Sequence, residues 1–123
     1  MKKWLLLILT GIFTITVHAQ ETKYTTLPNK EFAQTIQKEG VQFFDVRTPA
    51  EYAEKHIPKA KVLDFKSPDF ISKVDSLDKS QPVALYCLTG QRSKKAATAM
   101  AERGFQVYVL DNGLQKWKGK TEK

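Results

Sequence analysis

Short apolar runs alternate with amphipathic stretches along most of this chain, and this alternation limits its fold more than any other feature. The runs at 24–27, 41–46, 60–65, 82–87 and 105–113 have the length and residue content of strands. The run PVALYC is nearly all apolar, which is typical of a central strand covered on both faces. The alternation therefore predicts an α/β protein, a three-layer sandwich with a mostly parallel central sheet of about five strands.

Helix signals fill the intervals between these runs, over 29–40, 48–56, 67–77, 93–104 and 114–119. Thr48, Pro49 and Glu51 have the spacing of a capping box with proline at the first helical position. We expect Ser67 to cap the third helix, with Ile71 on its apolar face.

The N-terminus has the pattern of a secretory signal, which is a basic start, an uncharged apolar middle and a small residue at the exit. We expect residues 1–19 to be a signal peptide cleaved between Ala19 and Gln20, which leaves one domain at 20–123. The mature protein is then exported, with the periplasm as its expected compartment. An uncleaved membrane anchor is the alternative, although this stretch is short for a span of about 20 residues.

The charge balance argues against nucleic acid as a partner. Lysine and arginine number 20 against 13 acidic residues, a net charge of +7 that falls to +5 without Lys2 and Lys3. Part of this excess lies in the tail KWKGKTEK, which we expect to be a solvated end. Nucleic-acid binding calls for a basic stripe with interleaved aromatic residues on one face, and this sequence does not predict one.

Cys87 is the only cysteine, so the chain forms no internal disulfide and its fold depends on an apolar core. A lone thiol in an oxidising compartment is a liability unless it is buried or used. The domain holds one histidine, His56, which makes a cysteine-protease pairing poorly supported. One cysteine and one histidine do not make a metal site, so we expect neither metal nor cofactor.

The loop that begins at Cys87 leaves an apolar strand and enters a helix near Arg92. Gly90 permits a sharp turn, and the amides of such a turn point with the helix start at a common centre, which forms an anion site. The helix start and Arg92 would favour the thiolate, making Cys87 a nucleophile. The alternative is a small buried residue at a strand end, with Arg92 and its neighbours Lys94 and Lys95 on a solvated helix face.

Three stretches in the same order resemble single-domain rhodaneses, the thiosulfate-type sulfurtransferases. They are FDVRTPAEYAEKHIPKA (44–60), YCLTGQRS (86–93) and VYVLDNGLQKW (107–117). The resemblance implies that Cys87 takes a sulfane sulfur from a small anionic donor such as thiosulfate and forms a persulfide. The sulfur then passes to cyanide or to an acceptor thiol, a thioredoxin-like protein being one candidate. We expect a monomer.

The resemblance also assigns roles to individual residues. The loop would bind the persulfide and the donor through Leu88, Thr89, Gly90, Gln91, Arg92 and Ser93. The expected framework residues are Asp45, Arg47, Glu51 and His56. Arg47 would pair with Glu51, Asp45 would hydrogen-bond to nearby backbone, and His56 would be structural. Lys59 and Asn112 depart from the family pattern, because both stand where glycine is frequent.

Two other functions share this loop. Related phosphatases and arsenate reductases place the arginine after five residues, whereas four separate Cys87 from Arg92. The shorter spacing suits a single sulfur atom and favours sulfur transfer. A catalytically silent module that binds sulfur species or a redox partner would keep the same loop, so the sequence leaves this alternative open.

Overall fold

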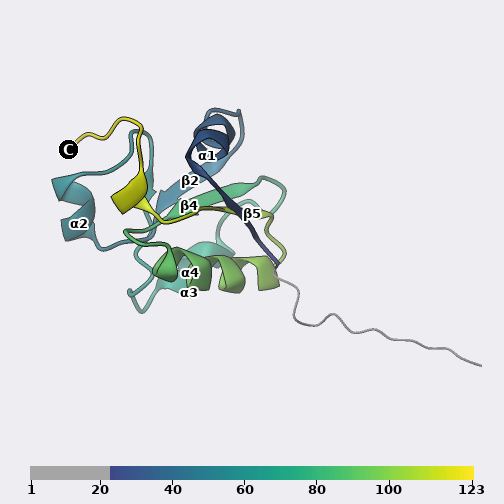
Figure 1. Cartoon of the computed structure of the whole chain (residues 1–123). Helices are drawn as coiled ribbons and strands as arrows, with labels where there is room; N and C mark the ends of the chain where they lie inside the picture. Colours follow the sequence, from purple (N-terminus) through teal and green to yellow (C-terminus); the bar gives the residue numbers. More distant parts are fainter. Residues whose placement is uncertain (1–22) are drawn as a thin grey trace, which may run out of the picture.

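Five parallel strands form the central sheet of the computed structural model, which describes residues 23–123 (Figure 1). Their order across the sheet is β1-β5-β4-β2-β3. The bounds are β1 Thr25–Leu27, β2 Gln42–Asp45, β3 Lys61–Val62, β4 Val83–Tyr86 and β5 Val107–Leu110. The predicted parallel sheet of about five strands is confirmed. The expected signal peptide and its cleavage site lie outside the described residues.

Helices cover both faces of the sheet (Figure 1). They are α1 Asn29–Ile36, α2 Pro49–Glu54, α3 Phe70–Asp75 and α4 Gln91–Glu102, followed by the 3₁₀ turn η1 Leu114–Lys116. One core lies between the sheet and the helices α3 and α4, and another lies beneath α1 and η1. Val83 and Leu85 face the first core and Ala84 and Tyr86 the second, so β4 is buried on both faces, as its sequence predicts.

Most of the expected elements are shorter than predicted, the third helix and the third strand most clearly. The third helix begins at Phe70, and Ser67 does not cap it, because the Ser67 hydroxyl donates to the Asp69 carboxylate in the turn that precedes the helix. Ile71 is 38% exposed and does not belong to the apolar face of this helix. The run 60–65 forms only two residues of strand. The capping box of α2 is confirmed, since Thr48 Oγ1 accepts from the Glu51 N–H and Glu51 Oε1 accepts from the Thr48 N–H.

The C-terminal tail is attached to the domain instead of being free in solvent. The Glu122 N–H donates to the His56 carbonyl and the His56 N–H donates to the Glu122 carbonyl, both at 2.8 Å. The Trp117 indole N–H donates to the Lys120 carbonyl at 3.0 Å. The lysine residues of the tail are exposed as predicted, but the tail backbone is hydrogen-bonded to the domain at Glu122.

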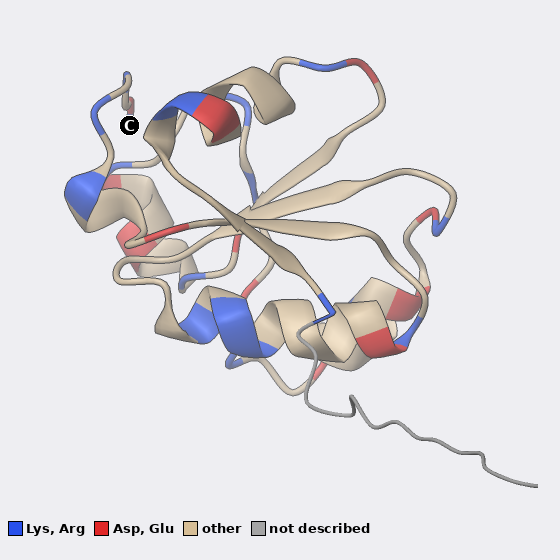
Figure 2. Cartoon of the chain, turned by 45° about the vertical axis from the view of Figure 1, so that its right-hand side comes forward, with Lys and Arg blue, Asp and Glu red and all other residues tan. Residues whose placement is uncertain are grey.

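Charged residues lie mainly on the helices and loops that surround the sheet (Figure 2). The lysine and arginine positions of α4 lie near its start, and its one acidic residue, Glu102, lies at its end (Figure 2). No helix in the part of the chain that the structure describes is long and apolar enough to cross a membrane.

Candidate active site

The loop between β4 and α4 folds around the sulfur of Cys87. Gly90, with φ of 104°, occupies the left-handed region, and α4 begins at the next residue. The Gly90 N–H donates to Cys87 Sγ at 3.1 Å and the Ser93 N–H donates at 3.4 Å. The Ser93 hydroxyl lies 3.4 Å from the same sulfur. The convergence of amides that the sequence predicts is therefore present.

These hydrogen bonds act against the effect of burial on the thiol. Cys87 has no exposed surface, and burial by itself raises the pKa of a thiol because it disfavours the charged form. The hydroxyl and N–H of Ser93, with the amides of Gly90 and Thr89, outweigh burial and hold the pKa of Cys87 below its ordinary value. The loop is thus an environment that stabilises a thiolate.

Arg92 binds a carboxylate from a distant part of the chain. Its guanidinium makes a two-pronged pair with Glu51, with Nη1–Oε1 at 2.8 Å and Nη2–Oε2 at 3.0 Å. The hydrogen bonds from Arg92 are the main reason that the pKa of the Glu51 carboxyl falls to about 2. Partial burial of Glu51 acts in the opposite direction, and the hydrogen bonds from Thr48 lower the pKa further. The ion pair joins the start of α2 to the start of α4, beside the sulfur of Cys87.

The expected pair between Arg47 and Glu51 is wrong. Arg47 pairs with Asp45, with Nη2–Oδ2 at 2.7 Å, and its Nη2 also donates to the Lys55 carbonyl at 2.6 Å. Arg47 lies just past the end of β2, in the bend that follows it, and this bend brings the guanidinium back against Asp45. Asp45 also accepts from the Arg47 N–H at 2.9 Å, so its predicted bond to nearby backbone is present.

His56 contacts groups outside the Cys87 loop. Its Nδ1 lies 2.9 Å from the Tyr52 carbonyl, and its ring stacks on the Tyr52 ring with centroids 3.8 Å apart. Its Nε2 lies 3.4 Å from the Glu122 carboxylate. None of these partners belongs to residues 87–93, so His56 joins the C-terminal tail to the end of α2.

A turn after β5 supports the loop from the other side, a contact that the sequence does not predict. The Leu114 N–H donates to the Cys87 carbonyl at 2.8 Å, and the Gln115 N–H donates to the Leu88 carbonyl at 3.0 Å. Gly113 allows this approach, because a Cβ there would lie 2.6 Å from the Cys87 carbonyl oxygen. The sequence signal is the turn dipeptide Asn112–Gly113, which begins two residues after the end of β5.

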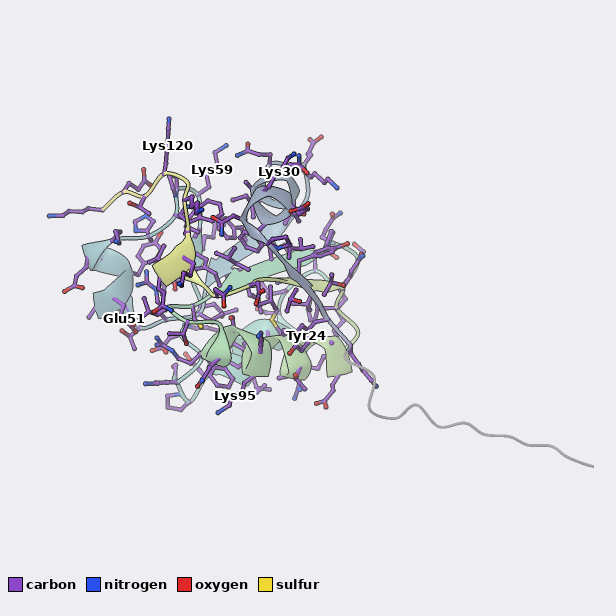
Figure 3. All side chains as sticks on the ribbon, viewed as in Figure 1. Tyr24, Lys30, Glu51, Lys59, Lys95 and Lys120 are labelled. Atoms are coloured by element: carbon purple, nitrogen blue, oxygen red, sulfur yellow. The ribbon has the colours of Figure 1, made fainter. Side chains whose placement is uncertain are left out.

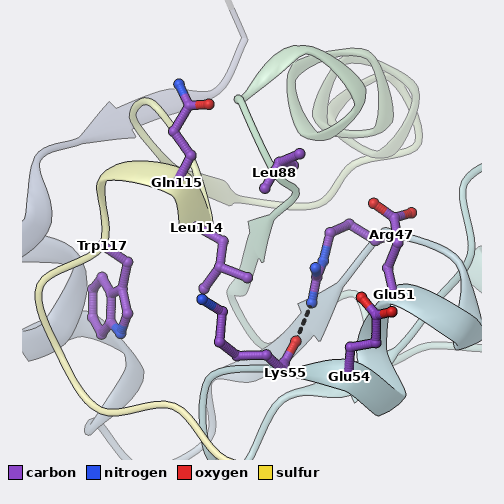
Figure 4. Close-up of a pocket in the computed structure, with 8 residues that line it drawn as sticks. All are labelled: Arg47, Glu51, Glu54, Lys55, Leu88, Leu114, Gln115 and Trp117. Carbon is purple, nitrogen blue, oxygen red and sulfur yellow. Dashed lines mark hydrogen bonds between the residues drawn. The ribbon is translucent and has the colours of Figure 1, made fainter.

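A hollow of about 330 Å³ opens beside the loop (Figure 4). Leu114 and Trp117 lie on one side, and Glu51 and Glu54 on the other. Leu88 lines it and is 39% exposed.

The other loop residues differ in their relation to the sulfur. Thr89 is exposed and contributes its backbone amide, and Gln91 is exposed as the first residue of α4. Among residues 23–123 there is no group of three or more His, Cys, Asp or Glu side chains that could hold a metal ion.

Comparison with known proteins identifies the family. The model of the rhodanese-like domain matches residues 28–120. The chain belongs to the rhodanese-like family. Two curated relatives, both named thiosulfate sulfurtransferase GlpE, come from Stutzerimonas stutzeri and Pseudomonas fluorescens. The first is 34% identical over 79% of this chain and 87% of its own length, and the second is 38% identical over 72% and 80%.

Solved structures agree with this fold. The rhodanese-related protein from Thermoplasma volcanium has a TM-score of 0.71 at 20% identity, covering 80% of this chain and 98% of its own. The rhodanese-like domain from Anabaena has a TM-score of 0.69 at 23% identity, covering 79% and 77%. The rhodanese-like fold that the three sequence stretches implied is confirmed.

The two departures from the rhodanese pattern fall on backbone of unusual conformation. Lys59 has φ of 77° and Asn112 has φ of 63°, both in the left-handed region that favours glycine. Asparagine adopts this region more readily than most residues, whereas lysine does so at a larger cost in free energy. Both positions therefore hold a backbone conformation that glycine would adopt without strain.

Proposed function

We propose that this protein is an exported sulfurtransferase of the rhodanese type, with Cys87 as the residue that carries the sulfur. The observation that carries the proposal is the set of hydrogen bonds from Gly90 and Ser93 to Cys87 Sγ, which favours a thiolate at the end of a buried strand. At the level of reaction class, sulfur transfer is supported by family membership and by the relatives named thiosulfate sulfurtransferase.

The reaction consists of two displacements at sulfur. The Cys87 thiolate attacks the sulfane sulfur of thiosulfate, the sulfur–sulfur bond of the donor breaks, and sulfite leaves with the electron pair. The product is a Cys87 persulfide. An acceptor thiolate or cyanide then attacks the outer sulfur, and Cys87 leaves as a thiolate stabilised by the same amides.

Under this proposal, the residues of the Cys87 loop and the pair of Arg92 with Glu51 have distinct roles. Leu88 to Ser93 bind the donor anion and the persulfide, with the amides of Thr89, Gly90 and Ser93 as the principal donors. Arg92 contributes positive charge beside the loop while Glu51 fixes its position. The donor is a small anionic sulfur compound, and the acceptor is cyanide or a thiol, including that of a thioredoxin-like protein. The protein acts as a monomer without a cofactor.

Export rests on the N-terminal sequence pattern. Two lysines, an uncharged apolar stretch and the small residue Ala19 before Gln20 support a cleaved signal and a periplasmic location. Cell fractionation tests this proposal, with the processed protein expected in the periplasmic fraction. Recovery of the full-length chain in the membrane fraction would support the uncleaved anchor instead.

A turnover assay separates an enzyme from a silent binding module. The purified protein should form thiocyanate catalytically from thiosulfate and cyanide, and the Cys87→Ser variant should form none while remaining folded. Binding of thiosulfate without turnover, tested with cyanide and with several thiols, would contradict the enzyme and support the module. Hydrolysis of an aryl phosphate that is lost in Cys87→Ser would instead support a phosphatase.

A further inference from the structure

Two adjoining hollows lie outside the site described above. One, of about 490 Å³, lies where Gly40 and β2 approach Lys61. The other, of about 270 Å³, lies between α1, Pro58 and Gly119. Both are lined by Ile36 and Lys59. We call these two hollows together the lysine groove.

The lysine groove combines an apolar floor with positive charge. Its apolar lining includes Ile36, Val41, Phe43, Ile57, Pro58 and Trp117. Its charged lining consists of Lys59, Lys61 and Lys120, and within the described part of the chain no aspartate or glutamate lines either hollow. Lys59 and Lys120 extend outwards on the same side of the molecule, whereas Lys95 lies on the opposite side (Figure 3). The hollow beside Cys87 differs, because Glu51 and Glu54 line it.

The backbone at Lys59 is an independent sign that this lysine has a use. With φ of 77°, Lys59 holds a conformation that glycine adopts freely and that a lysine adopts at a cost in free energy. Residues in such conformations persist where the surrounding structure holds them, and they occur preferentially at functional sites. The strained residue lines both hollows.

We propose that the lysine groove binds an acidic segment of a partner protein, whose protruding apolar side chains enter the two hollows. Three ammonium groups without acidic neighbours in the lining complement carboxylates. A concave apolar surface accepts side chains that protrude from an extended or helical segment, whereas insertion into a membrane calls for protruding apolar side chains on the protein itself.

A segment bound in the lysine groove would lie next to the Cys87 loop. Trp117 lines both the lysine groove and the hollow beside that loop, so the two sites meet at its side chain. The inference does not depend on the proposed reaction, because peptide binding requires no sulfur transfer.

The test is a titration of the exported, processed protein with three capped peptides, followed by calorimetry and by backbone amide shifts in NMR spectra. The first peptide places two leucines among glutamates, the second replaces the glutamates with lysines, and the third replaces the leucines with serines. We expect the first to bind and to shift the amides of Gly40, Lys59 and Gly119. The second should not bind, and the third should bind at least about tenfold more weakly, because each buried leucine contributes substantially.

Matched variants locate the binding site. Replacing Lys59, Lys61 and Lys120 together with glutamine should weaken binding of the first peptide about tenfold, since each rim charge contributes modestly. The control replaces Lys66, Lys79 and Lys95 with glutamine, which makes the same change in net charge at residues that line neither hollow. This control should bind the peptide with unchanged affinity.

Two single variants separate binding from structure and from catalysis. Lys59→Gly should weaken binding about threefold while it raises the melting temperature, because glycine relieves the backbone strain. A purely structural role for Lys59 would change only the melting temperature. Cys87→Ser should bind the peptide with unchanged affinity, so a failure of the proposed reaction would leave this result intact.

Three outcomes would overturn the inference. The first is that the peptide of leucines and glutamates does not bind, or that both triple variants weaken it equally. The second is binding to vesicles of anionic phospholipid, lost in the groove variant, without peptide binding, which would assign the lysine groove to a membrane. The third is self-association that is lost in the groove variant, which would assign it to a second copy of this chain.

Discussion

Arg47 and Arg92 each pair with a carboxylate, but the two pairs have different surroundings. Arg47 is 4% exposed and its partner Asp45, two residues earlier, is fully buried. Arg92 and Glu51 are 41 positions apart in the sequence, and their side chains are 21% and 32% exposed. Removing one partner of a buried ion pair leaves the other charge with neither a counter-charge nor water, which is costly in free energy. A partly exposed charge that loses its partner is solvated by water instead. The first pair therefore belongs to the framework, and the second joins two segments at the site.

Removing the buried carboxylate should have the largest effect on stability. Asp45→Asn leaves the Arg47 guanidinium buried without a counter-charge, which should lower the free energy of unfolding by about 3–5 kcal/mol. Urea unfolding measures this change. The double variant Asp45→Leu/Arg47→Met should recover most of the loss, because it leaves no unpaired charge. A loss below about 1 kcal/mol in the single variant would remove the distinction between the two pairs.

Removing Arg92 should affect the reaction more than the fold. Arg92→Ala should lower the free energy of unfolding by no more than about 1 kcal/mol, because its pair with Glu51 is partly exposed. The same variant should raise the thiosulfate concentration at half-maximal rate about tenfold, because a positive charge beside an anionic donor is lost.

Glu51→Gln is the matched variant for Arg92→Ala, because it keeps the guanidinium but releases it from its partner. We expect a smaller rise in the half-saturation for thiosulfate, in steady-state assays on both proteins. An unchanged half-saturation in Arg92→Ala would contradict a role for Arg92 in donor binding.

Lowering the pH should weaken the partly exposed pair between Arg92 and Glu51 over the range in which the Glu51 carboxylate becomes protonated. Arg92 lowers the pKa of Glu51 to about 2 in the folded protein, below the ordinary value near 4.5. The folded state therefore gains stability from this carboxylate above about pH 4.5 and loses it as the pH falls towards 2.

The comparison of wild type with Glu51→Gln isolates this contribution. Their difference in unfolding free energy should shrink across that range, by less than about 1 kcal/mol because the pair is partly exposed. Urea unfolding at several pH values measures the difference. A difference that stays constant between pH 5 and pH 2 would show that the Glu51 charge adds no stability.

The sequence predicts several features that depend on neighbouring residues and misses some that depend on distant ones. Three predicted features follow from a few adjacent residues, and each is present. They are the turn at Gly90, the amides that converge on Cys87 Sγ and the capping box at Thr48. The pairing of Glu51 with Arg92 does not follow from adjacent residues, because Arg92 reaches Glu51 only when β2 and β4 pair in the sheet.

Local competition explains another miss. Ser67 has the residue type of a helix cap, but its hydroxyl is taken by Asp69 in the same turn, and α3 starts later. The attached tail was missed for a different reason. The paired backbone of Glu122 and His56 carries no pattern that a single sequence reveals.

The most direct test of the central claim is the intact mass of the exported protein before and after incubation with thiosulfate. We predict the mass of a chain that begins at Gln20, and a gain of one sulfur atom at Cys87 that a thiol acceptor then removes. The Cys87→Ser variant should show the same processed mass and no gain. A processed and folded wild-type protein that gains no sulfur at Cys87 would contradict the role of Cys87 as the sulfur carrier.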